Sequence, residues 1–238
     1  MKNIRLAGVI VVLLAAAISS CTKSDDYKKF LESGPQIFPA KVDSLKVSTG
    51  RYRVGLSWII ASDPSVTGAR IYWNNRSDSM DVAIDAAGRP DTVKTIVSGL
   101  EEKPYTFEVF TFNKQGNRSI GVSASGRSLG ERYEEALLNW GVVHKQTIPA
   151  APPYNAGLVV WNPFYLDGIV GISASYTDAD GNEQVKIIPA DAAVAATSVS
   201  FVFEKFAPGS TLTYSTLYLP EKQALDTLSA APETITIQ

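Results

Sequence analysis

Short runs in which apolar and polar residues alternate, separated by turn residues, follow one another along the chain from Val42 onward. Alternation at every second position is typical of a β-strand with one buried face. Two of the clearest runs are residues 54–58 and 68–73. Their expected inward-facing residues are Val54, Leu56, Trp58, Ala69, Ile71 and Trp73. The pattern predicts an antiparallel β-sandwich with Trp58 in its core.

The first half continues with a tyrosine-containing run and a closing hairpin. The run Leu100–Val109 resembles the tyrosine corner at the start of strand F in fibronectin type III and immunoglobulin domains. Residues 113–117 predict a tight turn, because Gly and Asn tolerate the positive φ that such a hairpin requires. With a last strand over residues 120–125, we expect the first, fibronectin-III-like sandwich over residues 41–129.

The second half repeats this order. Residues 156–161 echo the run that ends at Trp58, and residues 172–176 follow at a similar distance. Where the tyrosine corner stood, either Leu212 replaces the corner tyrosine or Tyr214 serves in a shifted register. An internal repeat of this kind indicates a second domain of the same type. The expected fold class is all-β, with two tandem immunoglobulin-like or fibronectin-III-like β-sandwiches after a signal peptide, the second over residues 154–238.

One stretch between the halves has helical spacing. Residues 130–140 are rich in helix formers. The residues on one helical face are Tyr133, Ala136, Leu137 and Trp140. We expect a short helical connector whose apolar stripe packs between the sandwiches. The Pro-rich segment 149–153 is expected to complete this connector over residues 130–153 and to lead into the second sandwich.

The N-terminus carries the features of a lipoprotein leader. An apolar run over residues 6–18 follows two basic residues and is too short to span a bilayer as a helix. Small residues then lead to Cys21 in a pattern that resembles a lipobox, where signal peptidase II cleaves and the cysteine is acylated. Residues 1–20 are predicted to be a signal peptide, and residues 21–40 a tether lipidated at Cys21. A spare secreted thiol is the alternative, but the only cysteine can form no internal disulfide.

Charge and composition narrow the expected partners. The chain has 45% hydrophobic and 19% charged residues, in the range of an ordinary globular protein. Its formal net charge is −2, and removal of the leader, with Lys2 and Arg5, makes it more acidic. Because no cluster of Lys and Arg alternates with aromatic residues, nucleic acid is not an expected partner. The acidic pair Asp25-Asp26 resembles the signal that sends Bacteroidota lipoproteins to the outer face of the outer membrane; an acidic solvated tether is the alternative.

Five stretches carry a further resemblance. They are Tyr27–Phe30, Pro39–Leu45, Ala69–Arg76, Tyr105–Val109 and Gly116–Ser119. Together they resemble the Bacteroidota lipoproteins of domain-of-unknown-function family 4998, and the resemblance fades toward the second half. It implies a surface lipoprotein of glycan-utilising bacteria with no assigned biochemical activity.

Residues that could carry chemistry are few. His144 is the only histidine, and the chain has no nucleophile-elbow glycine pattern, so a catalytic triad is not expected. The counts of His and Cys exclude a zinc site, and no phosphate or dinucleotide motif occurs, so no cofactor is expected. Two carboxylates across a cleft, as in glycoside hydrolases, are left open. We therefore expect a non-catalytic protein and keep a carboxylate-based glycoside hydrolase as the lesser alternative.

Asp178, Asp180 and Asn182 form a candidate calcium loop, because oxygen-bearing side chains alternate around Gly181. The pattern stops before it supplies the roughly 6–8 oxygen ligands that Ca²⁺ takes. A hairpin turn is therefore the favoured interpretation, and no metal is expected.

The aromatic residues give the candidate binding patch. If the run Tyr105–Val109 alternates inward, Phe110 and Phe112 fall on the outer side of the same sheet. Tyr72 on the neighbouring strand is expected to face outward beside them, with Trp140 of the connector stripe as the fourth member. An exposed apolar patch marks an interaction surface, either a ligand platform or a contact covered by the connector or the second domain.

Four Asp-Ser/Thr-apolar triplets resemble the O-glycosylation signal of exported Bacteroidota proteins, although strand starts also favour such triplets. The candidate acceptors are Ser44, Ser79, Thr92 and Thr227. The expected function is that of an accessory surface lipoprotein that binds or presents glycan in a polysaccharide-utilisation system. The alternative is a structural or adhesion scaffold that binds another outer-membrane protein. A patch open beside a groove would favour a ligand, and a flat covered patch would favour the scaffold.

Overall fold

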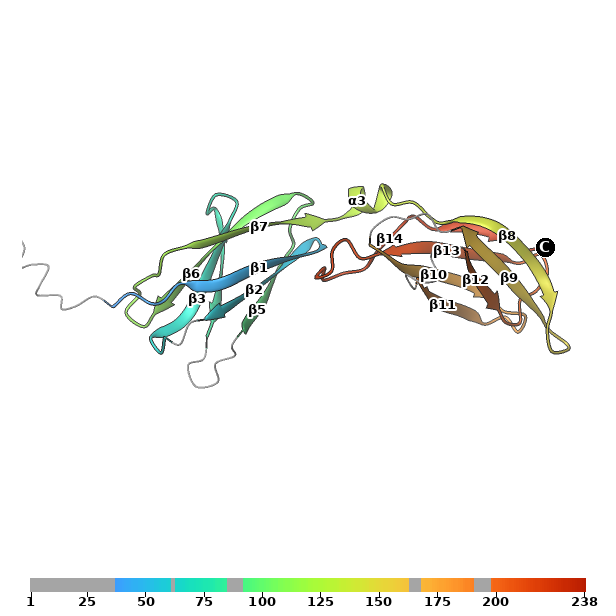
Figure 1. The fold of residues 1–238 in the computed structure, drawn as a ribbon, viewed down its shortest axis with the longest axis horizontal. Helices are drawn as coiled ribbons and strands as arrows, with labels where there is room; N and C mark the ends of the chain where they lie inside the picture. Colours follow the sequence, from blue (N-terminus) through green and yellow to red (C-terminus); the bar gives the residue numbers. More distant parts are fainter. Residues whose placement is uncertain (1–36, 61–62, 85–91, 163–167, 191–197) are drawn as a thin grey trace, which may run out of the picture.

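The computed structural model describes residues 37–60, 63–84, 92–162, 168–190 and 198–238. These residues form two β-sandwiches joined end to end into a rod (Figure 1). The predicted signal peptide and Cys21 lie outside the described residues. Within the described ranges, no helix has the length and apolar character needed to cross a bilayer.

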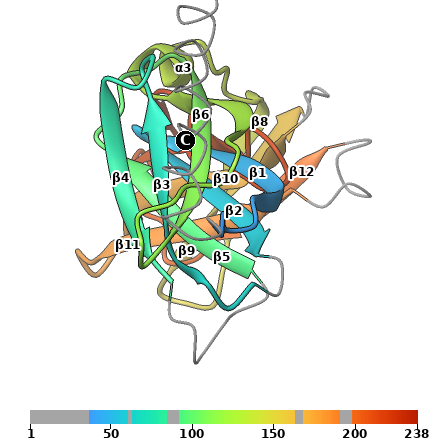
Figure 2. The ribbon, with the colours of Figure 1, turned by 90° about the vertical axis from the view of Figure 1, so that its left-hand side faces the viewer.

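The first sandwich consists of two sheets that meet at one edge. One layer has the strand order β4-β3-β6-β7 and the other the order β1-β2-β5. Their bounds are β1 (Val42–Arg51), β2 (Arg53–Ile60), β3 (Val66–Trp73), β4 (Asp78–Ala83), β5 (Thr92–Ser98), β6 (Pro104–Asn113) and β7 (Val122–Leu129). The ends of β1 and β7 pair in parallel and join the layers. Seen along the rod, β4, β3 and β6 lie in one layer, and β1, β2 and β5 lie in the other (Figure 2).

The second sandwich repeats this strand order. Its two sheets have the orders β12-β9-β8 and β11-β10-β13-β14, with β15 also paired to β13. The bounds are β8 (Gly141–Pro149), β9 (Asn155–Asn162), β10 (Ile169–Thr177), β11 (Glu183–Pro189), β12 (Val199–Phe203), β13 (Thr211–Tyr218), β14 (Leu228–Ser229) and β15 (Glu233–Thr236). In this repeat β8, β9 and β12 correspond to β1, β2 and β5. The prediction of two tandem sandwiches from the sequence echo is confirmed.

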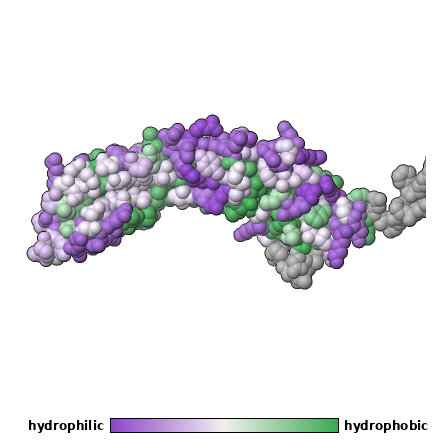
Figure 3. All heavy atoms as spheres, turned by 180° about the vertical axis from the view of Figure 1, so that it is seen from behind, coloured by the Kyte–Doolittle hydropathy of each residue, from purple (hydrophilic) through white to green (hydrophobic). Residues whose placement is uncertain are grey.

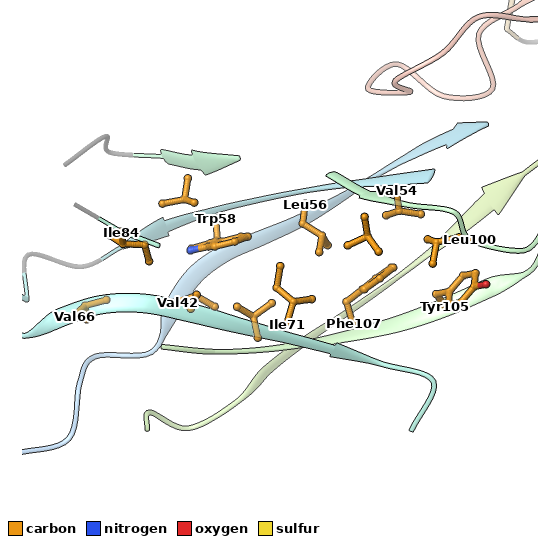
Figure 4. Packing of buried hydrophobic residues seen from close by; sticks show 14 residues of the cluster. Val42, Val54, Leu56, Trp58, Val66, Ile71, Ile84, Leu100, Tyr105 and Phe107 are labelled. Carbon is orange, nitrogen blue, oxygen red and sulfur yellow. The ribbon is translucent and has the colours of Figure 1, made fainter. Parts of the chain in front are cut away.

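The predicted alternation builds the first core. Trp58 of β2 is fully buried between the sheets and faces Ile71 of β3 and Phe107 of β6 (Figure 4). Trp73 is half-buried, and its ring centroid lies 6.3 Å from that of Phe107. The corresponding tryptophan of the second sandwich, Trp161 of β9, is also fully buried. Period-two patterning therefore placed the anchors of both cores correctly.

The inward side of β6 continues past Val109 with two polar residues rather than ending there. Thr111 and Asn113 are buried, and each binds the segment that leads into β1. The Thr111 hydroxyl donates to the carbonyl oxygen of Ala40 at 2.6 Å, and the Asn113 amide donates to that of Ile37 at 3.0 Å. These hydrogen bonds satisfy the buried polar atoms and fix the start of the described chain against the end of the first sandwich.

The connector differs from the expectation in length and packing. Its helix, α3 (Glu131–Glu135), contains no buried residue, and Ala136 is exposed. Trp140 is 2% exposed and belongs to the core of the second sandwich. The predicted apolar stripe between the domains is therefore not formed. The helix ends before Trp140, and this residue lies in the core of the second sandwich.

The boundary of the second sandwich is also earlier than expected. β8 pairs with β9 from Gly141 to Pro149, so the sandwich begins at Gly141 rather than at residue 154. The Pro-rich segment forms the turn of this β8–β9 hairpin and not a linker. The Tyr214 hydroxyl donates to the Trp140 carbonyl oxygen, much earlier in the chain, at 2.9 Å. A corner tyrosine would bind backbone only a few residues away, so Tyr214 is not a corner tyrosine. It is a core tyrosine that holds the connector, while Leu212 is fully buried two residues before it.

Candidate functional site

Tyr72, Phe110 and Phe112 lie together on the outer side of the β4-β3-β6-β7 sheet, as the sequence predicts. Each side chain is half-buried. The Tyr72 and Phe110 rings meet edge to face with centroids 5.9 Å apart, and Phe112 pairs across the strands with Gly68 of β3. With the arginines described below, these residues form the aromatic face.

Two glycines seat the phenylalanine rings against the sheet. A Cβ atom added to Gly68 would lie 2.3 Å from the Phe112 Cζ atom. A Cβ atom added to Gly121 would lie 2.7 Å from the Phe110 Cζ atom. Each ring therefore occupies space that a side chain at the glycine position would fill. The two glycines allow the rings to lie close to the backbone of the sheet.

Arginine side chains lie beside the rings. The Arg76 guanidinium lies 5.3 Å from the Phe110 ring centroid and donates to both Glu108 carboxylate oxygens, at 2.6 and 2.8 Å. Arg118 donates to the Tyr72 hydroxyl at 3.1 Å. Arg70, between Tyr72 and Gly68 on β3, is paired with Asp81 of β4, and this pairing lowers the pKa of the Asp81 carboxyl. Cations stacked on aromatic rings contribute attraction beyond area burial.

Trp140 does not belong to this patch. It lies in the second core, where its backbone N–H donates to the Thr216 hydroxyl at 2.9 Å. The connector does not cover the patch either, because α3 contacts the opposite end of the first sandwich through Glu102 and Tyr52. Tyr72, Phe110 and Phe112 are thus brought together and left open, and Trp140 is removed from the candidate site.

Two shallow hollows are described on the molecule, and neither touches the aromatic face. The larger, of about 370 Å³, lies beside the connector and is lined by Arg51, Glu131, Glu134, Glu135 and residues 229–232. The smaller, of about 230 Å³, lies on the second sandwich and is lined by Ser175, Tyr176, Thr177, Gly181, Glu183, Thr211 and Thr213. The aromatic face is open, as a ligand platform requires, but neither of these two hollows adjoins it. It therefore meets only one part of the criterion for a ligand set out from the sequence.

The candidate calcium loop is a hairpin between β10 and β11. One Asp178 oxygen accepts the backbone N–H groups of Asp180 and Asn182 at 3.0 and 2.8 Å, and the other accepts the Gln184 amide at 3.0 Å. The Asp180 oxygens accept Tyr154 at 2.9 Å and Lys205 at 2.6 Å. Hydrogen bonds to the charged form lower the pKa of both carboxyls. These oxygens are directed at protein donors, so the loop forms the hairpin turn that the sequence favoured over a calcium site.

The remaining predicted residues are scattered over the surface. His144 is exposed on β8 rather than in a loop. All four candidate glycosylation acceptors, Ser44, Ser79, Thr92 and Thr227, are exposed. Ser44 sits at a bulge in β1 with a positive φ of 51°. Exposure makes the four hydroxyls accessible to a modifying enzyme, and their modification stays a prediction.

A contact that the sequence did not reveal joins the two sandwiches. We call residues 219–227, between β13 and β14, the junction loop. Its Glu221 accepts the Thr49 N–H at 2.7 Å, and its Leu225 N–H donates to the Thr49 carbonyl oxygen at 2.7 Å. Asp226 accepts the Arg51 N–H at 2.8 Å and the Arg53 guanidinium at 3.0 Å. The junction loop of the second sandwich thereby binds the β1–β2 turn of the first sandwich.

The connector fixes the same junction from the other side. Arg51 pairs with Glu134 of α3 at 3.1 Å, and the first residues of α3 donate to Glu102 of the first sandwich. The Asn139 side chain binds the second sandwich through Ala231 and Thr216. Figure 3 shows hydrophilic surface over the middle of the rod, where these polar groups gather. The only sequence signal was the density of charged residues in 131–135, since their partners in the first sandwich are thirty or more residues away in the chain.

Comparison with known proteins gives a family match and structural likenesses at low identity. No curated protein matches the chain. Among solved structures, the chain is similar to the FN1–FN3 domains of chicken CNTN1, with 12% identity, a TM-score of 0.43 and coverage of 84% of this chain and 67% of that one. It is also similar to a two-domain fibronectin type-III segment of chicken tenascin, with 14% identity, a TM-score of 0.31 and coverage of 84% and 99%.

A family model for a domain of unknown function, DUF4998, matches residues 21–228. The match runs through both sandwiches as far as the first residue of β14, so the expectation that the likeness fades toward the second half is wrong. Because the matched segment covers most of the sequence, the chain belongs to the DUF4998 family.

Proposed function

We propose that this protein is a non-catalytic stalk, anchored to the outer membrane by lipid on Cys21 and displayed at the cell surface. The observation that carries the proposal is the doubly fixed junction. Backbone hydrogen bonds, a partly buried ion pair at Asp226 and the α3 contacts all join the sandwiches. Domains connected only by a linker move freely, whereas a junction held from two sides keeps a fixed geometry.

The positions of the chain ends support the same proposal. The described chain starts at one end of the rod, and β15 leads to the C-terminus at the other end (Figure 1). A lipid on Cys21 would therefore hold the first sandwich near the membrane and carry the turns at the far end of the second sandwich away from it. A stalk of this kind presents a partner or glycan at a set height above the membrane.

The stalk is tested by distance measurements between spin labels at the two ends. We would replace Ser65 in the first sandwich and Asn182 in the second by cysteine, in the mature chain carrying Cys21→Ser. One narrow distance distribution is expected, which Arg53→Ala/Asp226→Ala broadens. A broad distribution in the parent chain would refute the fixed junction. Membrane fractionation and acyl labelling of a Cys21→Ala chain test the anchor separately, since both signals should disappear.

Glycan binding at the aromatic face is the second candidate function. Three half-exposed aromatic side chains on one sheet face favour it, because sugar rings stack on such groups. The arginines beside these rings, and the position of both described hollows away from them, favour a protein partner instead. A glycan array probed with the mature Cys21→Ser chain decides between them. Binding that is lost in Phe110→Ala/Phe112→Ala would establish the glycan candidate, and no binding by a folded chain would leave the scaffold.

A further inference from the structure

Three apolar side chains project into solvent at the end of the rod where the described chain begins. Ile37 is 66% exposed, Phe38 is 62% exposed and Ile120, which precedes β7, is 79% exposed. We call this end, together with the β6–β7 turn, the N-terminal pole. Single exposed apolar residues are common on proteins, whereas three at one end mark a contact surface.

The backbone at this pole is held in place rather than trailing from the domain. The side-chain amides of Asn113 and Asn117 both donate to the Ile37 carbonyl oxygen at 3.0 Å. Three residues later, the Ala40 N–H donates to Asp63 at 2.7 Å. Ile37 and Phe38 are therefore presented outward by a fixed segment, and Ile120 lies beside the same turn, where Ser119 pairs with Thr111.

The chain upstream of the N-terminal pole indicates which surface this pole contacts. Residues 21–36 separate the predicted acylated Cys21 from Ile37, and such a segment spans at most roughly 55 Å when fully extended. An anchored chain would therefore keep the pole within that distance of the bilayer at all times. Tethering at short range gives a high effective concentration, so a weak apolar contact suffices to hold the pole on the surface.

We propose that the N-terminal pole rests on the lipid surface. Ile37, Phe38 and Ile120 enter the interfacial region, and the exposed cation Lys114 of the adjoining turn lies near lipid phosphates. The inference rests on the proposed lipid anchor and adds an orientation to it. Contact at the pole sets the long axis of the rod upright, whereas an anchor alone would let the rod lie down on the membrane.

Vesicle flotation tests the contact without the acyl chain. The mature chain carrying Cys21→Ser is mixed with phosphatidylcholine vesicles, with and without phosphatidylglycerol. The expected result is association that falls about tenfold or more in Ile37→Ser/Phe38→Ser/Ile120→Ser, because three apolar side chains leave the interface. The matched control is Val143→Ser/Val185→Ser/Ile187→Ser in the second sandwich, whose side chains are 60–62% exposed, and it should bind as the parent does. An equal loss in both variants would overturn the proposal.

A second measurement examines the pole in the acylated protein. Acylation consumes Cys21, the only cysteine, so Ile120→Cys or Asn182→Cys provides one site for an environment-sensitive dye. In reconstituted vesicles, a blue shift is expected at position 120 and none at position 182. No shift at position 120 would overturn the pole contact while leaving the anchor intact. Failure of the anchor would appear instead as loss of acyl labelling, while the flotation result on the Cys21→Ser chain would stand.

Discussion

The Arg53 guanidinium donates through Nε to the Asp226 carboxylate at 3.0 Å and so joins β2 of the first sandwich to the junction loop of the second. The same carboxylate accepts the Arg51 backbone N–H. One aspartate thus binds both residues that flank the β1–β2 turn at Tyr52. This carboxylate therefore ties the junction loop directly to the β1–β2 turn.

Replacement of Asp226 by Asn should loosen the junction without unfolding either sandwich. The amide keeps the shape of the side chain but loses the charge that pairs with Arg53. Small-angle scattering should show a broader range of overall dimensions than in the parent chain. Lys222→Ala, at an exposed position of the same loop, is the control and should leave the scattering curve unchanged. An unchanged curve for Asp226→Asn would show that the Asp226 charge is not needed and that the contacts of Thr49 and of α3 hold the junction.

Acid should weaken the junction in a defined pH range. Hydrogen bonds from Arg53, and then from the Arg51 N–H, hold the Asp226 pKa below its ordinary value. A group with a lowered folded-state pKa stabilises the fold fully above its unfolded pKa of about 3.9, and this contribution is lost as the pH falls from that value through the lowered folded-state pKa. The spin-label distance distribution should be constant near neutral pH and broaden below about pH 4. Broadening that begins near pH 6 would contradict this assignment.

Trp140→Ala should destabilise the second sandwich and leave the first unaffected. Its side chain is 2% exposed within the second core, and removal of a buried tryptophan costs about 3–5 kcal/mol. Urea denaturation should show one transition moved to lower urea and another unchanged. The control is Leu138→Ala, whose side chain is 62% exposed and which should change stability by less than about 0.5 kcal/mol. An unshifted transition in Trp140→Ala would place the residue outside the core.

Gly68→Ala should lift the Phe112 ring from the sheet. The new Cβ atom would lie 2.3 Å from Phe112 Cζ, which is the free end of a side chain and can move. We therefore expect large changes in the aromatic NMR signals of Phe112 and a stability loss of only about 1 kcal/mol. A Cβ atom at Gly141 meets nothing within 4 Å, so Gly141→Ala is the matched control. Unchanged Phe112 signals in Gly68→Ala would show that the ring is seated elsewhere.

The fold could be predicted from the sequence because alternation is a local property of each strand. The alternation of Val54, Leu56 and Trp58 predicts which side of the strand faces inward, without any information on the neighbouring strands. The position of Trp140 could not be predicted this way. The spacing of apolar residues from Tyr133 onward predicted one helical face. The helix ends at Glu135, however, and Trp140 packs in the core of the second sandwich. A local period cannot show where such a transition occurs.

The candidate site was predictable only in part for a related reason. The outward side of Phe110 and Phe112 followed from strand parity, whereas Gly68, Gly121 and Arg118 became relevant only through the pairing of β3, β6 and β7. Register between strands is set by the whole sandwich. The junction loop was missed because the only pattern noted in it, the triplet that ends at Leu228, indicates glycosylation and not a domain contact. Its contacts depend on the backbone of Thr49 and on the β1–β2 turn, which lie in the other domain.

The parallel pairing of β1 and β7 determines how the first sandwich would resist a pulling force. If the rod is pulled from its two ends, tension enters the first sandwich at the start of β1 and leaves it at the end of β7. Gly50 pairs with Ser128 and Arg51 with Leu129 near that exit, so these hydrogen bonds lie across the line of force and are loaded together. The first sandwich would have to shear rather than unzip, so a pull along the rod would extend this domain only after these bonds break together.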